Sequence, residues 1–330
     1  MEDRMSLSLP PELFRVFRSE SVFFLAVHEA PDGDALGSAL GLHIMLRKMG
    51  KESVLLFSRE EVPQKYLFMA GMDEVAAEAH PDPQVDDAVF VALECPSTER
   101  ISGYGEAAKR ARILVNIDHH PDNRVYGDIN VILPEAPSTT AIIMGLADDL
   151  GVVIDADTAT CLYVGLVTDT GRFQYDNTTA EAFELAARLV TLGAEPHRVF
   201  QEIYERVGYG ALRLLGVILA RAEYLPNDRL IWSIIRQEDL NENGADMRDS
   251  ESFIDFLRSV NGAQAAMLVK EHEEGRYRIS LRSRGKVDVS RIAHLKGGGG
   301  HRNAAGFTMN ASLPEVLEFV RREVGSQLRA

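Results

Sequence analysis

The chain has 330 residues, with 35 lysines and arginines against 50 aspartates and glutamates, and a formal net charge of −15. This balance excludes the extended basic surface that wraps long DNA or RNA. The length allows two domains with cores of their own. Two cysteines make no disulfide framework, and no apolar run approaches the roughly 20 residues of a membrane span. The charged N-terminus has no apolar signal core, so we expect a cytoplasmic protein without membrane or long nucleic-acid partners.

The first predicted strand covers residues 22–27, a short apolar run rich in β-forming side chains. It leads directly into His28, and Asp32 and Asp34 follow in a stretch that a proline and a glycine mark as a turn. Apolar residues at helical spacing then predict a helix over residues 35–49. The two aspartates could be turn and N-cap residues only. Three potential ligands within seven positions favour a metal site.

Two further apolar runs predict strands at residues 88–93 and 112–117. The first is followed by Glu94, and the second by the run Asp118–His120. Either motif by itself is weak evidence, because a loop carboxylate is commonly solvated and a D-H-H tripeptide also arises by chance. However, side chains that follow the ends of such strands lie in the crevice where open α/β sheets place their sites.

A fourth apolar run, residues 162–167, leads into Asp169. We predict a strand here, but its length and setting also fit a helix, whose end could hold a ligand equally well. Four such runs, each ending in a carboxylate or histidine, supply enough ligands for two divalent ions. The mixture of imidazole and carboxylate favours Mn²⁺ over Mg²⁺. Paired ions of this kind are the usual device for phosphoryl chemistry.

The predicted organisation is an α/β protein with two domains. Strands alternate with helices up to about residue 192, which predicts a parallel sheet covered on both faces. The helices are expected at residues 139–150, 157–166 in part, and 179–192. We divide the chain into a first domain (1–192), a helical connector (193–225) and a smaller α/β domain (226–330) with strands at 230–235, 265–270 and 277–282. The active site is expected in the cleft between the domains.

The second domain contains a basic, glycine-rich segment. Residues 276–302 hold eight lysines and arginines and one acidic residue, Asp288. The run Gly297–Gly300 lacks the spacing of a dinucleotide fingerprint. A flexible linker is the alternative, but the following H-R-N-A-A-G is not linker composition. Glycines let a backbone approach a phosphate or base closely. A small basic patch on an acidic protein fits a short, multiply charged ligand.

In combination, these motifs resemble the DHH phosphoesterase superfamily, and within it the bacterial oligoribonuclease and pAp phosphatase group (nanoRNases). That group has H-x-x-x-D-x-D, an isolated acidic residue, D-H-H and T-D-T-G in this order, and a G-G-G-H-x-x-A-A-G block in its DHH-associated C-terminal domain. The resemblance covers roughly residues 21–319. The one departure is Glu94, because the family normally has aspartate there.

The resemblance implies roles for individual residues. One metal would be held by His28, Asp32 and Glu94. The other would be held by Asp34, Glu94, His119 and Asp169, with Glu94 bridging the two ions. Asp118 and His120 would be catalytic residues beside the metals, orienting ligands or contacting phosphate. The substrate-binding residues would be Arg282, Arg284, Gly298, Gly299, Gly300 and His301.

The function implied is that of a Mn-dependent hydrolase with two metal ions, which degrades short oligonucleotides to mononucleotides and also removes the 3′-phosphate of pAp. A homodimer is compatible with this hypothesis. Phosphodiesterase action on pApA or related linear or cyclic dinucleotides is the alternative. A type II pyrophosphatase is disfavoured by the glycine block, and RecJ-type processive action by the lack of an added nucleic-acid domain. A nucleotide-binding module with a weakened metal site is the alternative from another class, suggested by Glu94 alone.

Overall fold

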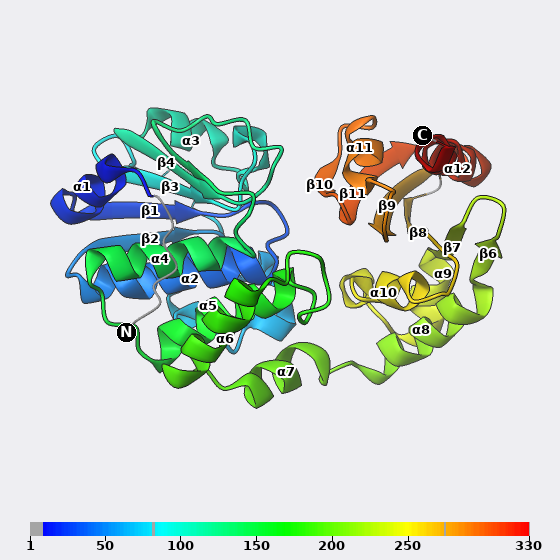
Figure 1. The fold of residues 1–330 in the computed structure, drawn as a ribbon, viewed down its shortest axis with the longest axis horizontal. Helices are drawn as coiled ribbons and strands as arrows, with labels where there is room; N and C mark the ends of the chain where they lie inside the picture. The colour runs from blue at the N-terminus through cyan, green and yellow to red at the C-terminus, as the bar shows by residue number, and fades with distance from the viewer. Residues whose placement is uncertain (1–8, 81–82, 274, 330) are drawn as a thin grey trace. The chain divides into compact units, whose positions relative to one another are not determined.

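The computed structural model of the chain describes residues 9–80, 83–273 and 275–329 (Figure 1). The chain divides into two compact units, Met1–Arg206 and Val207–Ala330. The division falls inside the predicted connector. Helix α7 (Pro196–Tyr204) belongs to the first unit, and α8 (Tyr209–Arg221) belongs to the second.

The first unit is built on a parallel five-stranded sheet in the order β2-β1-β3-β4-β5. Its strands are β1 (Val22–Ala26), β2 (Glu52–Leu56), β3 (Val89–Leu93), β4 (Ile113–Asp118) and β5 (Ile129–Ile132). The predicted strands at residues 22–27, 88–93 and 112–117 are confirmed to within one residue at each end as β1, β3 and β4. The parallel sheet is confirmed as well.

Helices cover both faces of this sheet. Side chains of its central strands accordingly lie alternately in two apolar clusters, one on each face. Phe23 and Leu25 of β1 lie in the larger cluster, and Phe24 and Ala26 lie in the smaller one. The larger cluster includes side chains from α1 (Pro11–Ser19), α2 (Gly33–Lys48), α4 (Thr139–Leu150), α5 (Ala156–Asp169), α6 (Ala180–Thr191) and α7. The smaller one includes α3 (Gly105–Arg110), which Figure 1 shows on the opposite side of the sheet. Short 3₁₀ turns complete the unit at Arg59–Glu61, Gln64–Tyr66, Met72–Glu74 and Thr98–Arg100.

The strand predicted at residues 162–167 is wrong, because these residues lie inside helix α5. The helical alternative is the correct one. Every residue from Cys161 to Val167 is buried, so the segment is apolar on all sides. A short apolar run without periodicity is compatible with a buried strand or with a buried helix. Asp169 is therefore placed by the end of a helix. Glu94 directly follows β3, and the D-H-H run begins at the last residue of β4.

Glycines bring α2 and α5 unusually close together. A Cβ atom added at Gly37 would lie 2.5 Å from the backbone oxygen of Cys161, and one at Gly41 would lie 2.9 Å from the side chain of Leu162. On the α5 side, a Cβ atom at Gly165 would lie 2.6 Å from a carboxylate oxygen of Asp34. The absence of side chains at these positions therefore sets the distance between the helices and leaves room for the Asp34 carboxylate.

The second unit contains a mixed six-stranded sheet in the order β10-β11-β9-β8-β7-β6, in which only β7 and β8 pair in parallel. Its strands are β6 (Glu223–Leu225), β7 (Leu230–Ile235), β8 (Ala265–Glu273), β9 (Arg276–Ser283), β10 (Gly299–His301) and β11 (Ala304–Asn310). The three strands predicted in this domain are confirmed as β7, β8 and β9.

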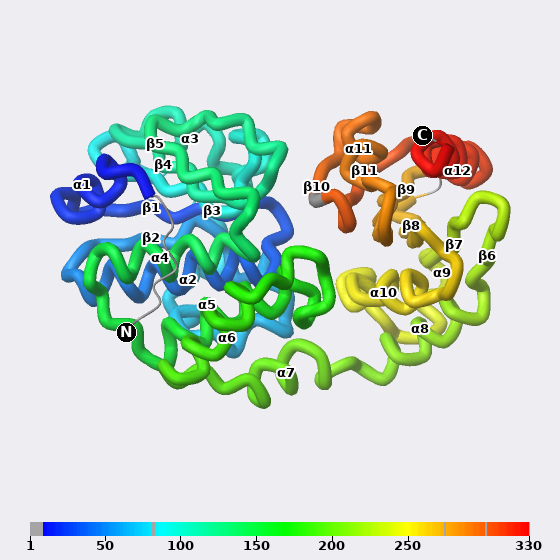
Figure 2. The backbone as a smooth tube through the Cα atoms, in the orientation of Figure 1, coloured from blue at the N-terminus to red at the C-terminus, as the bar shows by residue number. Residues whose placement is uncertain are grey.

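Helices lie on both faces of the second sheet as well. One face packs against α11 (Val289–His294) and α12 (Leu313–Arg329). The other packs against α8 and α10 (Phe253–Arg258), next to α9 (Gln237–Asn243) and the 3₁₀ turn Met247–Ser250. The path of the backbone through both units can be followed in Figure 2. Within the described ranges, no helix is long and apolar enough to cross a membrane.

Candidate metal centre

The first candidate ligands lie in the loop that joins β1 to α2. Asp32 is the N-cap of α2, and its carboxylate accepts hydrogen bonds from the backbone N–H groups of Asp34 (3.1 Å) and Ala35 (3.0 Å). His28 is buried, and its Nε2 lies 3.9 Å from Asp32 Oδ1. The cap interpretation is therefore correct for Asp32 and wrong for Asp34, which lies inside α2. It leaves ligation open, since His28 approaches the capping oxygen.

Asp34 is buried at the first turn of α2 and is held by the N-terminus of α4. Its two carboxylate oxygens accept hydrogen bonds from the backbone N–H groups of Thr139 (2.6 Å) and Thr140 (3.0 Å). The same helix end is capped by Ser138, whose side chain accepts from Ala141 N. Unpaired N–H groups and the helix dipole at such an end stabilise a negative charge. The Asp34 carboxylate is thus fixed in place.

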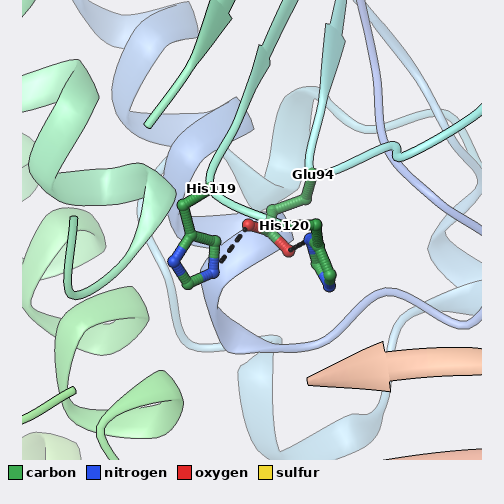
Figure 3. Close-up of side chains that lie close together, drawn as sticks. All are labelled: Glu94, His119 and His120. Atoms are coloured by element: carbon green, nitrogen blue, oxygen red, sulfur yellow. Dashed lines mark ion pairs between the residues drawn. The ribbon is translucent and has the colours of Figure 1, made fainter. Parts of the chain in front are cut away.

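Glu94 follows β3 in a left-handed backbone conformation, with φ of 59°, and its side chain is almost fully buried. Its carboxylate lies between two imidazole rings, 3.3 Å from Nε2 of His119 and 3.5 Å from Nδ1 of His120 (Figure 3). The hydroxyl of Thr139 donates a hydrogen bond of 2.5 Å to Glu94 Oε1. A buried, non-glycine residue with positive φ is uncommon and often marks a functional site.

His119 lies among the carboxylates at this edge of the sheet. Its Nδ1 is 3.0 Å from the backbone oxygen of Ala136, which favours the tautomer with the proton on Nδ1. Its Nε2 is then the lone-pair nitrogen, and it lies 3.4 Å from Asp169 Oδ2 and 3.9 Å from Asp34 Oδ2. Asp169 also accepts a hydrogen bond of 3.1 Å from the amide of Asn177.

Asp118 and His120 form a pair beside these groups. Asp118 Oδ1 lies 2.8 Å from His120 Nδ1, and the backbone N–H of His120 donates to the same oxygen. Asn123 donates to Asp118 Oδ2 at 2.6 Å. Burial raises the pKa of the Asp118 carboxyl, but the hydrogen bonds and charge of His120 outweigh it, so the net pKa is lowered. Asp118 is therefore an anion whose hydrogen bonds fix the orientation of the His120 ring.

The structure brings all six expected metal ligands together. In the described part of the chain, three groups of side chains each have candidate ligand atoms within 4.8 Å of one another. These groups are His28, Asp32 and Glu94; Asp34, His119 and Asp169; and Glu94, His119 and His120. Carboxylate oxygens and imidazole nitrogens at this spacing are a donor set that suits a divalent transition metal.

The electrostatics of the cluster also fit a bound cation. Burial and the nearby carboxylates raise the pKa of Glu94 well above its ordinary value. Burial, together with Asp34 and Asp32, raises the pKa of Asp169 to about 7, although His119 acts in the opposite direction. Burial lowers the pKa of His119, but the charges of Asp169 and Asp34 outweigh this effect and raise it overall. Crowded buried carboxylates of this kind are costly unless cations compensate them.

The expected substrate-binding residues lie in the second unit. Arg282 is on β9, where its Nε lies 3.7 Å from Asp255 Oδ1, and Arg284 follows that strand at the surface. The side chain of His301 lies outside what the structure describes. The glycines have a structural cause: a Cβ at Gly298 would overlap the backbone of Gly306, and Gly300 has φ of 131°. Close pairing of β10 with β11 therefore requires glycine at these positions.

Sequence reasoning missed three residues whose side chains donate hydrogen bonds to the carboxylates of the site: Thr139, Asn123 and Asn177. Asn123 ends the D-H-H-P-D-N run, and Asn177 follows the T-D-T-G run by a few residues. Their proximity to the motifs was the only available signal. For Thr139 the sequence offered none, because its segment was recognised only as a helix start.

The fold and the donor set define a class: a two-domain α/β protein with a candidate divalent-metal centre at one edge of a parallel sheet. Family models match in both units, the DHH family N-terminal domain at residues 23–166 and the DHHA1 domain at residues 227–326. The chain belongs to the DHH family, with a DHHA1 domain following the DHH domain.

Curated relatives extend the similarity over most of the chain. The bifunctional oligoribonuclease and PAP phosphatase NrnA of Thermus thermophilus is 32% identical over 313 residues, which cover 92% of this chain and 91% of the relative. The protein of the same name from Bacillus subtilis is 28% identical over 300 residues, covering 89% and 91%.

Solved structures are similar in fold. An exopolyphosphatase-related protein from Bacteroides fragilis has a TM-score of 0.84 at 24% identity, covering 96% of this chain and 95% of its own. RecJ from Thermus thermophilus, solved with Mn²⁺, has a TM-score of 0.57 at 14% identity and covers 98% of this chain but 55% of its own. These likenesses show a shared fold.

Proposed function

We propose that this chain is a metal-dependent phosphoesterase that hydrolyses short oligonucleotides to mononucleotides and removes the 3′-phosphate of pAp. One observation supports it most directly: six candidate ligands from four separate segments converge on one buried cluster, namely His28, Asp32, Asp34, Glu94, His119 and Asp169. The names of the relatives give the substrate class. They are 28–32% identical over about nine-tenths of the chain.

The proposed cofactors are two Mn²⁺ ions. His28, Asp32 and Glu94 would hold one, and Asp34, Glu94, His119 and Asp169 would hold the other. Two of the side-chain groups share no residue, and the Glu94 carboxylate of one lies 3.3 Å from His119 of the other, which supports a pair of ions with Glu94 between them. When bound, such ions lower the pKa of a coordinated water and neutralise charge on phosphoryl oxygens.

The chain itself would supply orientation and proton control. Asp118 accepts at His120 Nδ1, so the opposite nitrogen of that ring is directed away from Asp118. We propose that His120 contacts the phosphate of the substrate and that Asp118 orients the His120 ring. Helix α4 would keep Asp34 in a fixed position while substrate binds, because both oxygens are hydrogen-bonded to backbone N–H groups.

The direct test is a substrate panel after chelation and metal readdition. We expect the chelated protein to be inactive towards a five-nucleotide RNA, pAp, pApA and pyrophosphate. Activity should return best with Mn²⁺, on the RNA and on pAp, with products resolved by chromatography. Activity on pApA alone would favour the dinucleotide phosphodiesterase. Nucleotide binding without turnover would favour the binding module, and full activity in excess chelator would exclude the metal mechanism.

We propose that the second domain binds substrate through Arg282, Arg284, Gly298, Gly299, Gly300 and His301. The scarcity of acidic residues in segment 276–302 supports this role. Arg282→Ala should raise KM about tenfold on a five-nucleotide RNA, in line with the loss of one charged phosphate contact. It should have little effect on an aryl phosphodiester and on Mn²⁺ affinity. Arg291→Ala, which removes an exposed arginine from the same segment, is the control. Equal losses on both substrates would contradict the assignment.

The proposal includes a homodimer, which an apolar stripe on α8 supports. Tyr209, Leu212 and Leu219 lie on one face of this helix, with side chains 77%, 56% and 42% exposed. Exposed apolar residues at this spacing commonly pack against another helix. Sedimentation equilibrium should give twice the chain mass, and Leu212→Glu should give the monomer. A monomer for the unmodified chain at all concentrations would contradict the dimer.

A cytoplasmic location is also part of the proposal. Cys95 and Cys161 are buried free cysteines, and burial raises the pKa of both thiols, so they are poorly reactive. Unpaired cysteines are the rule in reducing compartments. Cell fractionation with detection of the chain would test the location.

A further inference from the structure

Thr139 forms hydrogen bonds to both Asp34 and Glu94. It is the first residue of α4 and is fully buried. Its backbone N–H donates to Asp34 Oδ2 at 2.6 Å, while its hydroxyl donates to Glu94 Oε1 at 2.5 Å. Two carboxylates from different loops are therefore tied to two polar groups of a single residue.

The glutamate at position 94 needs such a contact more than an aspartate would. Its side chain has one more rotatable bond, and fixing that bond costs conformational entropy. The imidazole nitrogens of His119 and His120 lie further from its oxygens, at 3.3 and 3.5 Å, than the Thr139 hydroxyl does. The hydroxyl of Thr139 thus makes the shortest of these three contacts, and this contact holds the Glu94 carboxylate in one position.

Thr139 is itself held rigidly. Its β-branched side chain has few allowed rotamers in a helix. The preceding residue, Ser138, caps the helix, and the following N–H, of Thr140, is bonded to Asp34. Neither the backbone nor the side chain of Thr139 can turn away without breaking contacts in the buried cluster.

We propose that Thr139 is a positioning residue that fixes the Glu94 carboxylate and sets its distance from Asp34, and thereby adapts the metal centre to glutamate at this position. The inference rests on the proposed function, since it takes Glu94 and Asp34 as metal ligands. Thr139 acts through these carboxylates and is not itself a ligand. A purely structural role would depend on the shape of the side chain and not on its hydroxyl.

A pair of substitutions separates the hydroxyl from the shape. Thr139→Val keeps the branched shape and the N–H bond to Asp34 but removes the hydroxyl, whereas Thr139→Ser keeps the hydroxyl. We expect Thr139→Val to weaken binding of Mn²⁺ to the chelator-treated full-length protein at least about tenfold, as is typical when the partner of a metal ligand is lost. Thr139→Ser should remain within about threefold of the unmodified protein. Calorimetric titration with Mn²⁺ alone measures both.

The same comparison in a Glu94→Asp background tests the dependence on glutamate. Aspartate is shorter by one C–C bond of about 1.5 Å, so its carboxylate does not reach the Thr139 hydroxyl to form the hydrogen bond. In this background Thr139→Val should change Mn²⁺ affinity less than threefold. The idea is overturned if Thr139→Val binds Mn²⁺ normally, if Thr139→Ser loses as much as Thr139→Val, or if the loss is equal in both backgrounds. Thermal unfolding of each metal-free variant reports a general effect on folding.

Mn²⁺ binding by the Glu94→Gln variant tests the ligand assignment separately from the role of Thr139. If Glu94→Gln leaves Mn²⁺ affinity unchanged, the ligand assignment itself fails. If Glu94→Gln abolishes binding but Thr139→Val does not, the ligand assignment stands and only the positioning role of Thr139 is lost.

Discussion

Replacing Glu94 with glutamine will lower kcat by about 100-fold or more and weaken Mn²⁺ binding, because a neutral amide cannot balance charge between two dications. Glu94→Asp should retain a substantial fraction of the activity, since aspartate keeps the carboxylate charge. Calorimetric titration with Mn²⁺ and steady-state rates on a five-nucleotide RNA provide the measurements. Rates like those of the unmodified protein for Glu94→Gln would show that Glu94 is not a ligand.

The same substitution should stabilise the metal-free protein. Burial and neighbouring carboxylates raise the pKa of Glu94 well above its ordinary value. Because the pKa of Glu94 is higher in the folded state, the folded state binds this proton more tightly than the unfolded state does. The stability gained in this way is complete at low pH. It is lost progressively as the pH rises from about 4.5 towards the folded value. Glutamine does not ionise, so Glu94→Gln avoids this loss of stability. Without metal, the Tm of the variant should exceed that of the unmodified protein by more at pH 8 than at pH 5. A lower Tm at both pH values would instead indicate a structural role.

Adding one methyl group to Gly37 will destabilise the first unit by about 2 kcal/mol or more, as overpacking in a rigid core does. The new Cβ would lie 2.5 Å from the backbone oxygen of Cys161, which cannot rotate away as a side chain can. Helices α2 and α5 would have to separate, although alanine is by itself the better helix former.

Gly216 is the matched control for this substitution. It lies in the middle of α8, is exposed, and has open space around its missing Cβ. Gly216→Ala should therefore raise stability by up to about 1 kcal/mol. Gly216 lies on the face of α8 that is proposed to form the dimer, so both substitutions are made in the Leu212→Glu background, which is expected to be monomeric. Urea or thermal unfolding of the two metal-free variants in this background measures the difference. A Gly37→Ala variant as stable as Gly216→Ala would show that the close contact between α2 and α5 is readily relaxed.

Much of the candidate centre could be predicted from sequence because its ligands lie at or shortly after the ends of short apolar runs. Strands β1, β3 and β4 end at one edge of the parallel sheet, so residues far apart in the chain meet there. The same reasoning misassigned residues 162–167, since total burial removes the periodicity that distinguishes helix from strand. This error did not affect the ligand prediction, because the predicted strand would end two residues before Asp169 and the observed helix ends at Asp169.

The contacts around the ligands could not be predicted in the same way. The helix at residues 139–150 was predicted with the observed bounds, but its pattern does not say which carboxylate its N-terminus meets. The glycines at 297–300 have a structural role that their composition did not indicate. Gly298 and Gly300 permit β10 to pair closely with β11. The first contact joins distant segments and the second depends on backbone distances within a hairpin, and a sequence pattern specifies neither.

The position of Asp169 at the end of α5 has a consequence for how the protein is made. It is the last of the proposed ligands along the chain, and it precedes the whole of the second unit. Domains generally fold in turn as the chain leaves the ribosome. The proposed centre therefore stays incomplete until α5 has emerged, and shorter nascent chains have the earlier carboxylates without the last one. Once α5 has folded against α2, the centre has all of its ligands while the second domain is still being synthesised.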